Sequence, residues 1–238
     1  MSARRRLAAL AVAAPLALVA AAPAQSWAAP TIEQMVVFRG GKADQTRAPS
    51  GAVEVKVGRR RCAVAGSTPL AALWRRKPAR LRLRDFASCS SRPRDAGQLY
   101  VARIGGQGER GAGGWVYKVG RREASAGAGD PTGPFGRGRL KRGQRVLWFF
   151  CRVAGDCQRT LELRSRVELG GAVTFTVVGY DSQGKGVRVA GARVKAGSAS
   201  VVTGADGTVR TTLAPGRYKI HSSKKGLVRS FTESLVVR

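Results

Sequence analysis

A single histidine is the first candidate for chemistry in this sequence. His221 lies in the segment RYKIHSS, beside Ser222 and Ser223. Nucleophilic catalysis by a serine needs a histidine at a cleft with a carboxylate beside it. Nothing in the sequence places Asp206 or Glu233 there. We therefore interpret His221 as a structural strand residue and expect the protein not to be an enzyme.

Motifs for cofactors are also lacking. The Gly-x-Gly pieces within 127–129 and 136–138 lack the strand-to-helix context of a phosphate-cradling loop. The few acidic residues form no obvious pair for glycoside chemistry. We therefore expect no cofactor.

The cysteines predict disulfides. The chain has four, Cys62, Cys89, Cys151 and Cys157, which allow three pairings. Cys151 and Cys157 flank the turn-like loop RVAGD, so their Cα atoms could come within bridging range. That pairing leaves Cys62 with Cys89. A zinc site is the alternative, but neither pair has metal-ligand spacing, and disulfides favour an oxidising compartment.

The first residues have the pattern of a secretory signal peptide. Arg4–Arg6 precede an apolar run that extends from Leu7 to about residue 22, and Ala22-Pro23-Ala24 offers a cleavage site. We expect a signal peptide over 1–24, with an alternative cut after residue 28. The run is too short for a stable membrane span. We therefore expect a secreted, extracellular protein without a transmembrane segment, which charge could retain at the cell surface.

The charge balance is strongly positive, with a formal net charge of +29 from 43 Lys and Arg against 14 Asp and Glu. Such a protein adheres to polyanions at low salt. We expect an acidic envelope polymer or another polyanion as its partner. Nucleic-acid binding through charge alone is an alternative, and it would be blind to sequence. A GC-rich codon bias, which raises Arg, Ala and Gly together, is the compositional alternative.

The segment ARLRLRDF, residues 79–86, could make such a contact. Leu81 and Leu83 alternate with arginines, which a strand would place on its opposite face. A plain solvated face is the alternative interpretation. The candidate polyanion contacts are the cations on and before this segment: Arg75, Arg76, Lys77, Arg80, Arg82 and Arg84.

These residues are positioned by a chain of strands and one helix. Thr68 can cap a helix that starts at Pro69, and apolar residues recur at helical spacing, at Leu70, Leu73 and Trp74. We expect that helix to end before Pro78. The expected strands around it are 31–38, 52–57, 79–86, 99–105, 114–120, 145–152 and 160–165.

The segment GGWVYKVG places Trp115 and Tyr117 on one face of its expected strand. One interpretation is that these aromatic residues fill a core. The alternative is a small-ligand pocket lined by Trp115, Tyr117 and Trp148, with loop 123–138 at its mouth. An aromatic residue at alternate strand positions is typical of a core.

Three motifs carry a resemblance over residues 31–164: GWVYKV at 114–119, GAGD at 127–130, and the run from Gly143 to Trp148. With the helix TPLAAL, they resemble a family of bacterial secreted domains of unknown function related to the C-terminal domain of transcobalamin. The resemblance implies a β-grasp-like fold, a small mixed sheet with one helix across it. It also implies the alternative of a corrinoid- or tetrapyrrole-like ligand.

Residues 172–238 have another character, with strands at regular spacing and turn signals between them. The motifs VAGA at 189–192, TxxDG at 203–207 and LxPGxY at 213–218 resemble carboxypeptidase-regulatory-like or collagen-adhesin B-type repeats. The resemblance implies a small Ig-like or prealbumin-like β-sandwich that acts as a spacer. We therefore expect a mainly β protein of two domains, with a short linker at 165–171.

Overall fold

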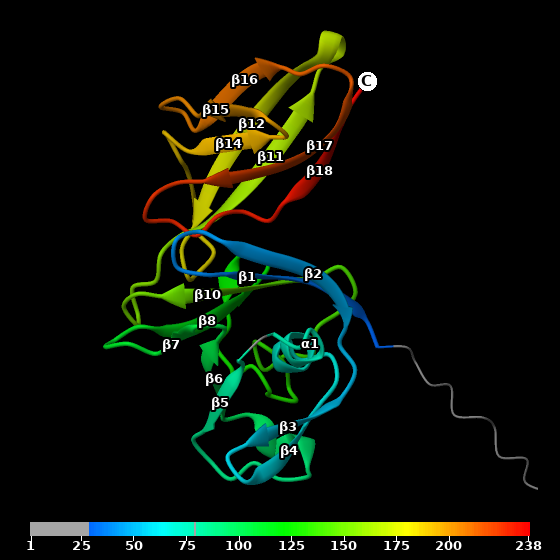
Figure 1. Cartoon of the computed structure of the whole chain (residues 1–238), viewed down its shortest axis with the longest axis vertical. Helices are drawn as coiled ribbons and strands as arrows, with labels where there is room; N and C mark the ends of the chain where they lie inside the picture. The colour runs from blue at the N-terminus through cyan, green and yellow to red at the C-terminus, as the bar shows by residue number, and fades with distance from the viewer. Residues whose placement is uncertain (1–28, 79) are drawn as a thin grey trace, which may run out of the picture.

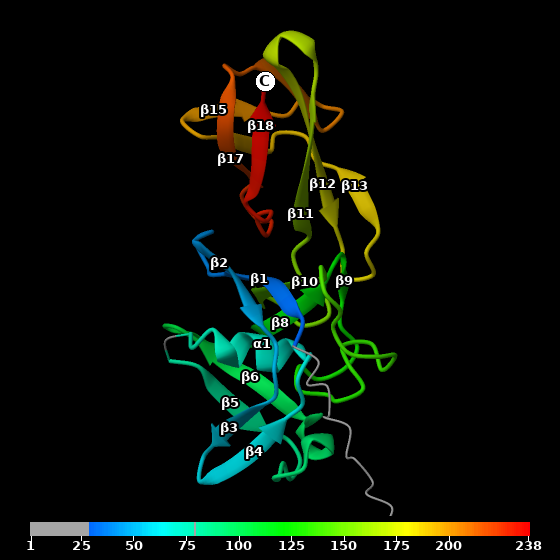
Figure 2. The same ribbon diagram turned by 90° about the vertical axis from the view of Figure 1, so that its right-hand side faces the viewer.

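A computed structural model of the chain describes residues 29–78 and 80–238. The predicted signal peptide, 1–24 or 1–28, lies outside the described residues. The described chain is mainly β with one short α-helix, which confirms the predicted fold class. Figures 1 and 2 show two bodies stacked end to end along the long axis. We call residues 29–158 the first unit and residues 159–238 the second unit.

The first unit is built on a five-stranded mixed sheet in the order β2-β1-β10-β8-β9. Its two central strands, β1 and β10, are parallel, with Val36 opposite Trp148. The other pairs are antiparallel. The strands are β1 (Thr31–Val37), β2 (Ala43–Pro49), β8 (Gly114–Val119), β9 (Arg122–Glu123) and β10 (Arg145–Cys151).

Strand β10 is buried on both faces, because each face of the sheet is covered by a different layer. Trp148 and Phe150 point into the core that contains the helix. Leu147 and Phe149 point the other way and pack with Val228 of the second unit. A strand buried on both faces has a near-continuous apolar sequence, which is the character of RVLWFFC.

Helix α1 (Pro69–Arg75) forms as its sequence predicts. The Thr68 hydroxyl accepts a hydrogen bond from the Ala71 N–H at 3.2 Å, and Pro69 occupies the first turn, where its missing N–H costs nothing. The Gln34 side chain on β1 donates to the Ala72 carbonyl at 2.7 Å. The cap and this bond hold the helix across one face of the sheet.

Smaller sheets complete the first unit. Both disulfides of the chain lie in the first unit. Cys62 is bonded to Cys89, with 5.4 Å between their Cα atoms, and Cys151 to Cys157, with 4.9 Å, so the preferred pairing is confirmed. The remaining elements are β3 (Val53–Val57), β4 (Arg60–Val64), β5 (Arg82–Asp85), the 3-10 turn η1 (Pro93–Ala96), β6 (Leu99–Ile104) and β7 (Gln107–Gly108).

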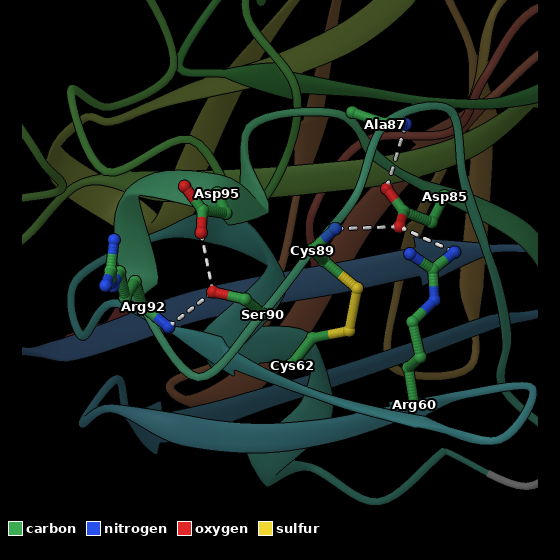
Figure 3. Close-up of a disulfide and its surroundings, with 8 residues drawn as sticks. All are labelled: Arg60, Cys62, Asp85, Ala87, Cys89, Ser90, Arg92 and Asp95. Carbon is green, nitrogen blue, oxygen red and sulfur yellow. Dashed lines mark hydrogen bonds and ion pairs between the residues drawn. A yellow bond between two sulfur atoms is a disulfide. The ribbon is translucent and has the colours of Figure 1, made fainter.

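The Cys89 loop is also held by hydrogen bonds around its disulfide (Figure 3). The Asp85 carboxylate accepts from the Cys89 N–H at 2.9 Å and from the Ala87 N–H at 3.1 Å. It also pairs with Arg60 at 3.3 Å. The Asp85 carboxylate therefore links the Cys89 loop to β4, the strand that contains Cys62.

The second unit is a β-sandwich of two four-stranded sheets. One sheet has β12 at its centre, and the other has the order β15-β14-β17-β18. The core between them is mostly aliphatic, with Phe175 as its largest buried side chain. The elements are β11 (Thr160–Val167), η2 (Leu169–Gly171), β12 (Ala172–Tyr180), β13 (Gly186–Arg188), β14 (Arg193–Ala196), β15 (Ala199–Val202), β16 (Thr208–Thr212), β17 (Gly216–Ser223) and β18 (Glu233–Val237).

The boundary between the units differs from the expected one. Strand β11 was expected to complete the first unit, and 165–171 to form a linker. Instead β11 pairs with β12 along its whole length, from Thr160 opposite Tyr180 to Val167 opposite Val173. Its Leu161 and Leu163 are buried in the sandwich core. Residues 165–171 are therefore the end of a hairpin, and the chain crosses between units before residue 160.

The interface between the units combines the apolar cluster around Val228 with polar contacts. Lys118 on β8 is fully buried, and its Nζ donates to the Tyr180 carbonyl at 2.9 Å and the Asp181 carbonyl at 2.7 Å. Burial lowers the pKa of this ammonium group to about 8. Nearby, Arg145 on β10 bonds Glu233 through both Nη atoms, at 2.5 and 2.9 Å. These contacts dock the second unit on the open face of the first sheet.

Candidate anion-binding site

The aromatic residues proposed as a pocket lie in the core of the first unit. Trp115, Tyr117 and Trp148 are 2 %, 7 % and 1 % exposed. The Trp115 indole N–H donates to the Gln107 carbonyl at 2.8 Å, and the ring centroids of Tyr117 and Trp148 lie 5.0 Å apart. Their rings therefore pack the helix-side core and do not line a pocket mouth.

Loop 123–138 is held to that core. The Tyr117 hydroxyl donates to the Ala126 carbonyl at 2.7 Å, and burial raises the pKa of this hydroxyl, so it remains a donor. The Ser125 and Ala126 N–H groups donate to the Pro134 carbonyl. The loop is thus closed on itself above Tyr117, and the arrangement gives the small-ligand alternative no support.

The predicted arginine stripe is shorter than expected. Arg82 and Arg84 share the exposed face of β5, but Arg80 precedes the strand with a φ of 54° and does not continue the alternation. Arg84 pairs with Glu109 at 2.9 Å. Among the described residues, Arg82 is therefore the one arginine of β5 without an acidic partner.

The cations at the end of α1 are mostly engaged in the first unit. The Arg76 side chain is largely buried and pairs with Asp44, and burial lowers the pKa of its guanidinium. Arg75 donates to the Ala52 carbonyl at 2.9 Å. Lys77 is exposed. The six predicted contact residues therefore do not form one continuous free surface.

A more concentrated cationic site lies where the two units meet. It is a hollow of about 580 Å³, which we call the inter-unit hollow. The first unit contributes Gly40, Gly41 and Arg152. The second unit contributes four cations: Arg193, Lys224, Lys225 and Arg229. Among the residues that the structure describes, no carboxylate lines this hollow.

Turns and strand ends present these side chains. The Leu227 N–H donates to the Lys224 carbonyl at 3.1 Å, and this turn after β17 projects Lys224 and Lys225. Gly40 and Gly41 form the β1–β2 turn with φ near 85°, which glycine adopts without a Cβ clash. Figure 1 shows these two turns at the junction of the units.

The other two exposed cations flank the turns. Arg193 begins β14 and lies opposite Ser223 in the register of β14 with β17. Arg152 directly follows β10, inside the loop that the Cys151–Cys157 disulfide closes. The disulfide therefore limits the positions that the Arg152 backbone can take beside the second unit.

The hollow has a positive electrostatic environment. Lys224 donates to the Ala190 carbonyl at 2.6 Å, and Arg229 donates to the Thr232 hydroxyl at 3.0 Å. None of the five cations makes an ion pair within the described ranges. Burial lowers the pKa of the Arg229 guanidinium. The hollow therefore offers donors and positive charge to an anion.

His221 reports the same positive field. Burial lowers the pKa of its imidazole, and the charges of Arg229 and Lys195 lower it further. Ser222, one residue along β17, is fully buried, and its N–H donates to the Ser230 hydroxyl. His221 and Ser222 alternate along a strand, so their side chains point to opposite faces. His221 and Ser222 therefore do not form a serine–histidine pair.

Metal-ligand clusters and membrane-spanning helices are absent from the described residues. Within 29–78 and 80–238, no three His, Cys, Asp or Glu side chains lie close enough to hold a metal ion. Over the same ranges, no helix has the length and hydropathy needed to cross a bilayer.

The fold and the site together define a mainly β, disulfide-bonded protein with a cationic hollow between its two units. Comparisons with protein-family models, curated proteins and solved structures find no match to this chain.

Sequence reasoning missed the hollow. The run SSKKG carries a local signal, because two lysines before a glycine indicate a basic turn. Arg152 and Arg193 carry no such signal, since only the docking of the units brings them near that turn.

Proposed function

We propose that this is a secreted, non-enzymatic protein that binds acidic polymers outside the cell, with the inter-unit hollow as its principal contact. The observation that carries the proposal is a hollow with five cations and no carboxylate among the described residues. The two disulfides and the signal-like N-terminal sequence support an extracellular or cell-envelope location. The sequence resemblances to secreted and surface domains agree with it.

Charge pairing elsewhere in the protein explains why the hollow should make the largest contribution to polyanion binding. Many of the few acidic residues are already paired, as in Glu33 and Glu233 with Arg145 and Glu162 with Arg121. Exposed cations spaced along a surface attract a polyanion weakly and non-specifically. Cations that converge on one hollow act together on the same ligand, so their contributions add at one place.

The test compares two variants with the same loss of charge. Lys224→Gln/Lys225→Gln removes two charges from the hollow, and Arg80→Gln/Arg82→Gln removes two from the predicted stripe. Binding of the mature protein to isolated cell-envelope fractions and to DNA is measured across a salt series. We expect the hollow variant to lose about tenfold in envelope affinity, and the stripe variant much less.

The outcomes separate the hypotheses. Equal losses in the two variants would mean that net charge, not the hollow, governs binding. Tighter binding to DNA than to envelope at every salt concentration would favour the nucleic-acid alternative. Steep weakening with salt is expected in either case, because counterions compete for the same cations.

A further inference from the structure

The inter-unit hollow belongs to neither unit alone. Arg152 and the Gly40–Gly41 turn form one wall, and the second unit supplies the other four cations. Building on the proposed function, we propose that the hollow binds a run of closely spaced phosphoryl groups and that this ligand clamps the two units together. The site is complete only when the units are docked.

The hollow is the repulsive side of the interface. Arg152 of the first unit faces Arg193, Lys224, Lys225 and Arg229 of the second, with no described carboxylate between them. Like charges across a gap repel, and salt screens this repulsion only in part at such short range. Without an anion, this side therefore weakens docking.

The attractive contacts lie elsewhere along the same interface. Lys118 donates to Tyr180 and Asp181, and the Ser182 hydroxyl donates to the Glu123 carboxylate at 2.5 Å. Arg145 bonds Glu233. None of these residues lines the hollow. Docking is therefore a balance between a side with hydrogen bonds and apolar packing around Val228 and a charged side, and an anion in the hollow shifts that balance.

The size and donors of the hollow indicate the ligand class. Its volume of about 580 Å³ is many times the roughly 30 Å³ that one water occupies, so it has room for several anionic groups. Phosphoryl oxygens accept bonds from arginine forks and from lysine alike. Phosphoryl groups also bring more negative charge into a given volume than single carboxylates do. Five convergent cations therefore favour a phosphate-rich chain.

Linkage gives the clamp a distinctive consequence. A ligand that contacts both units binds the docked state better, so a change that lowers the docked fraction raises the apparent dissociation constant by the same factor. Lys118→Met removes bonds across the interface and does not touch the hollow. Lys56→Met, on exposed β3 of the first unit, is its matched control.

The experiment titrates the full mature chain with tripolyphosphate at constant ionic strength. We expect Lys118→Met to lower the affinity about fivefold or more, and Lys56→Met to leave it unchanged. Ser182→Ala tests the same linkage with a milder change, in case Lys118→Met disturbs folding. His221 is the only histidine of the chain, and the charge of Arg229, which lines the hollow, acts on it, so its NMR resonance responds to charge in the hollow. A bound anion should raise the pKa of His221, because it offsets the charges of Arg229 and Lys195.

Each outcome has a separate meaning. If tripolyphosphate binds the wild type and Lys224→Gln/Lys225→Gln weakens it, but Lys118→Met and Ser182→Ala match Lys56→Met, the clamp is wrong and the proposed function stands. If the hollow variant binds as the wild type does, the proposed function fails as well. If polyglutamate of matched charge binds as tightly as tripolyphosphate, the phosphoryl assignment is wrong.

Discussion

The two units are stabilised by different interactions. The first unit packs Trp115, Trp148 and Phe150 around a short helix and carries both disulfides. The second unit has no cysteine, and its core is aliphatic around Phe175. The first unit also contains a long stretch without strands between β9 and β10, whereas the connections between strands of the second unit are shorter.

This difference teaches where each unit obtains its order. Irregular backbone forms few ladder hydrogen bonds, so large buried rings and covalent links must hold it in place. A sandwich of regular strands satisfies its backbone in its own sheets and needs fewer anchors. We therefore expect the first unit to respond most to loss of rings and disulfides, and the second to loss of hydrogen bonds at its turns.

The largest expected effect is that of Trp115→Ala. Truncation of a buried tryptophan leaves a cavity and should lower the free energy of unfolding of the first unit by about 3–5 kcal/mol. All tryptophans of the chain precede residue 159, so tryptophan fluorescence in a urea titration follows the first unit. An unchanged transition with lost ligand binding would contradict the assignment of Trp115 to the core.

Removal of disulfides should have the next largest effect. Loop-closure entropy predicts a loss of about 3–4 kcal/mol for Cys62→Ala/Cys89→Ala, and about 2–3 kcal/mol for Cys151→Ala/Cys157→Ala, whose loop is shorter. Urea titrations followed by fluorescence measure both. The His221 resonance should show the second unit unfolding at its original urea concentration. If the transition seen at His221 moved to a lower urea concentration by the same amount as the fluorescence transition, the two units would unfold as one.

Loss of the buried hydrogen bonds of Thr203 tests the stability of the second unit. Its buried hydroxyl donates to the Val189 carbonyl at 2.7 Å and accepts from the Ala192 N–H at 2.9 Å. Thr203→Val keeps the shape and leaves both groups unpaired, which should cost about 1–3 kcal/mol. Thr203→Ser, which keeps the hydroxyl, is the control. Equal losses in the two variants would show that the methyl group matters more than the bonds.

The smallest expected effect is a pH dependence from His221. Its pKa is lowered in the folded state, so between the ordinary value near 6.5 and the folded value the unfolded chain binds more protons. The free energy of unfolding should therefore fall as pH drops through this window, and His221 should contribute nothing above it. His221→Gln should flatten this part of the profile. An unchanged profile would mean that the imidazole is not desolvated in the folded state.

Local features of the fold were predictable because their causes are local. The Thr68 cap and Pro69 specify the start of α1 whatever the helix packs against. The short Cys151–Cys157 loop selects its own disulfide, and the remaining pair follows. The alternation of Trp115 and Tyr117 correctly indicates a strand face. In each case the residues that interact are close in sequence.

The sequence by itself thus determined the fold class, the single helix, the disulfide pairing and the positive charge, since each depends on composition or short spacing. Only the tertiary structure decided which residues share a site. The pairing of β11 with β12 moved the boundary between the units, and Glu109 neutralised Arg84 of the expected stripe. Docking brought Arg152 to the turn of Lys224. Contacts between distant segments depend on how the layers pack, and no local pattern encodes that arrangement.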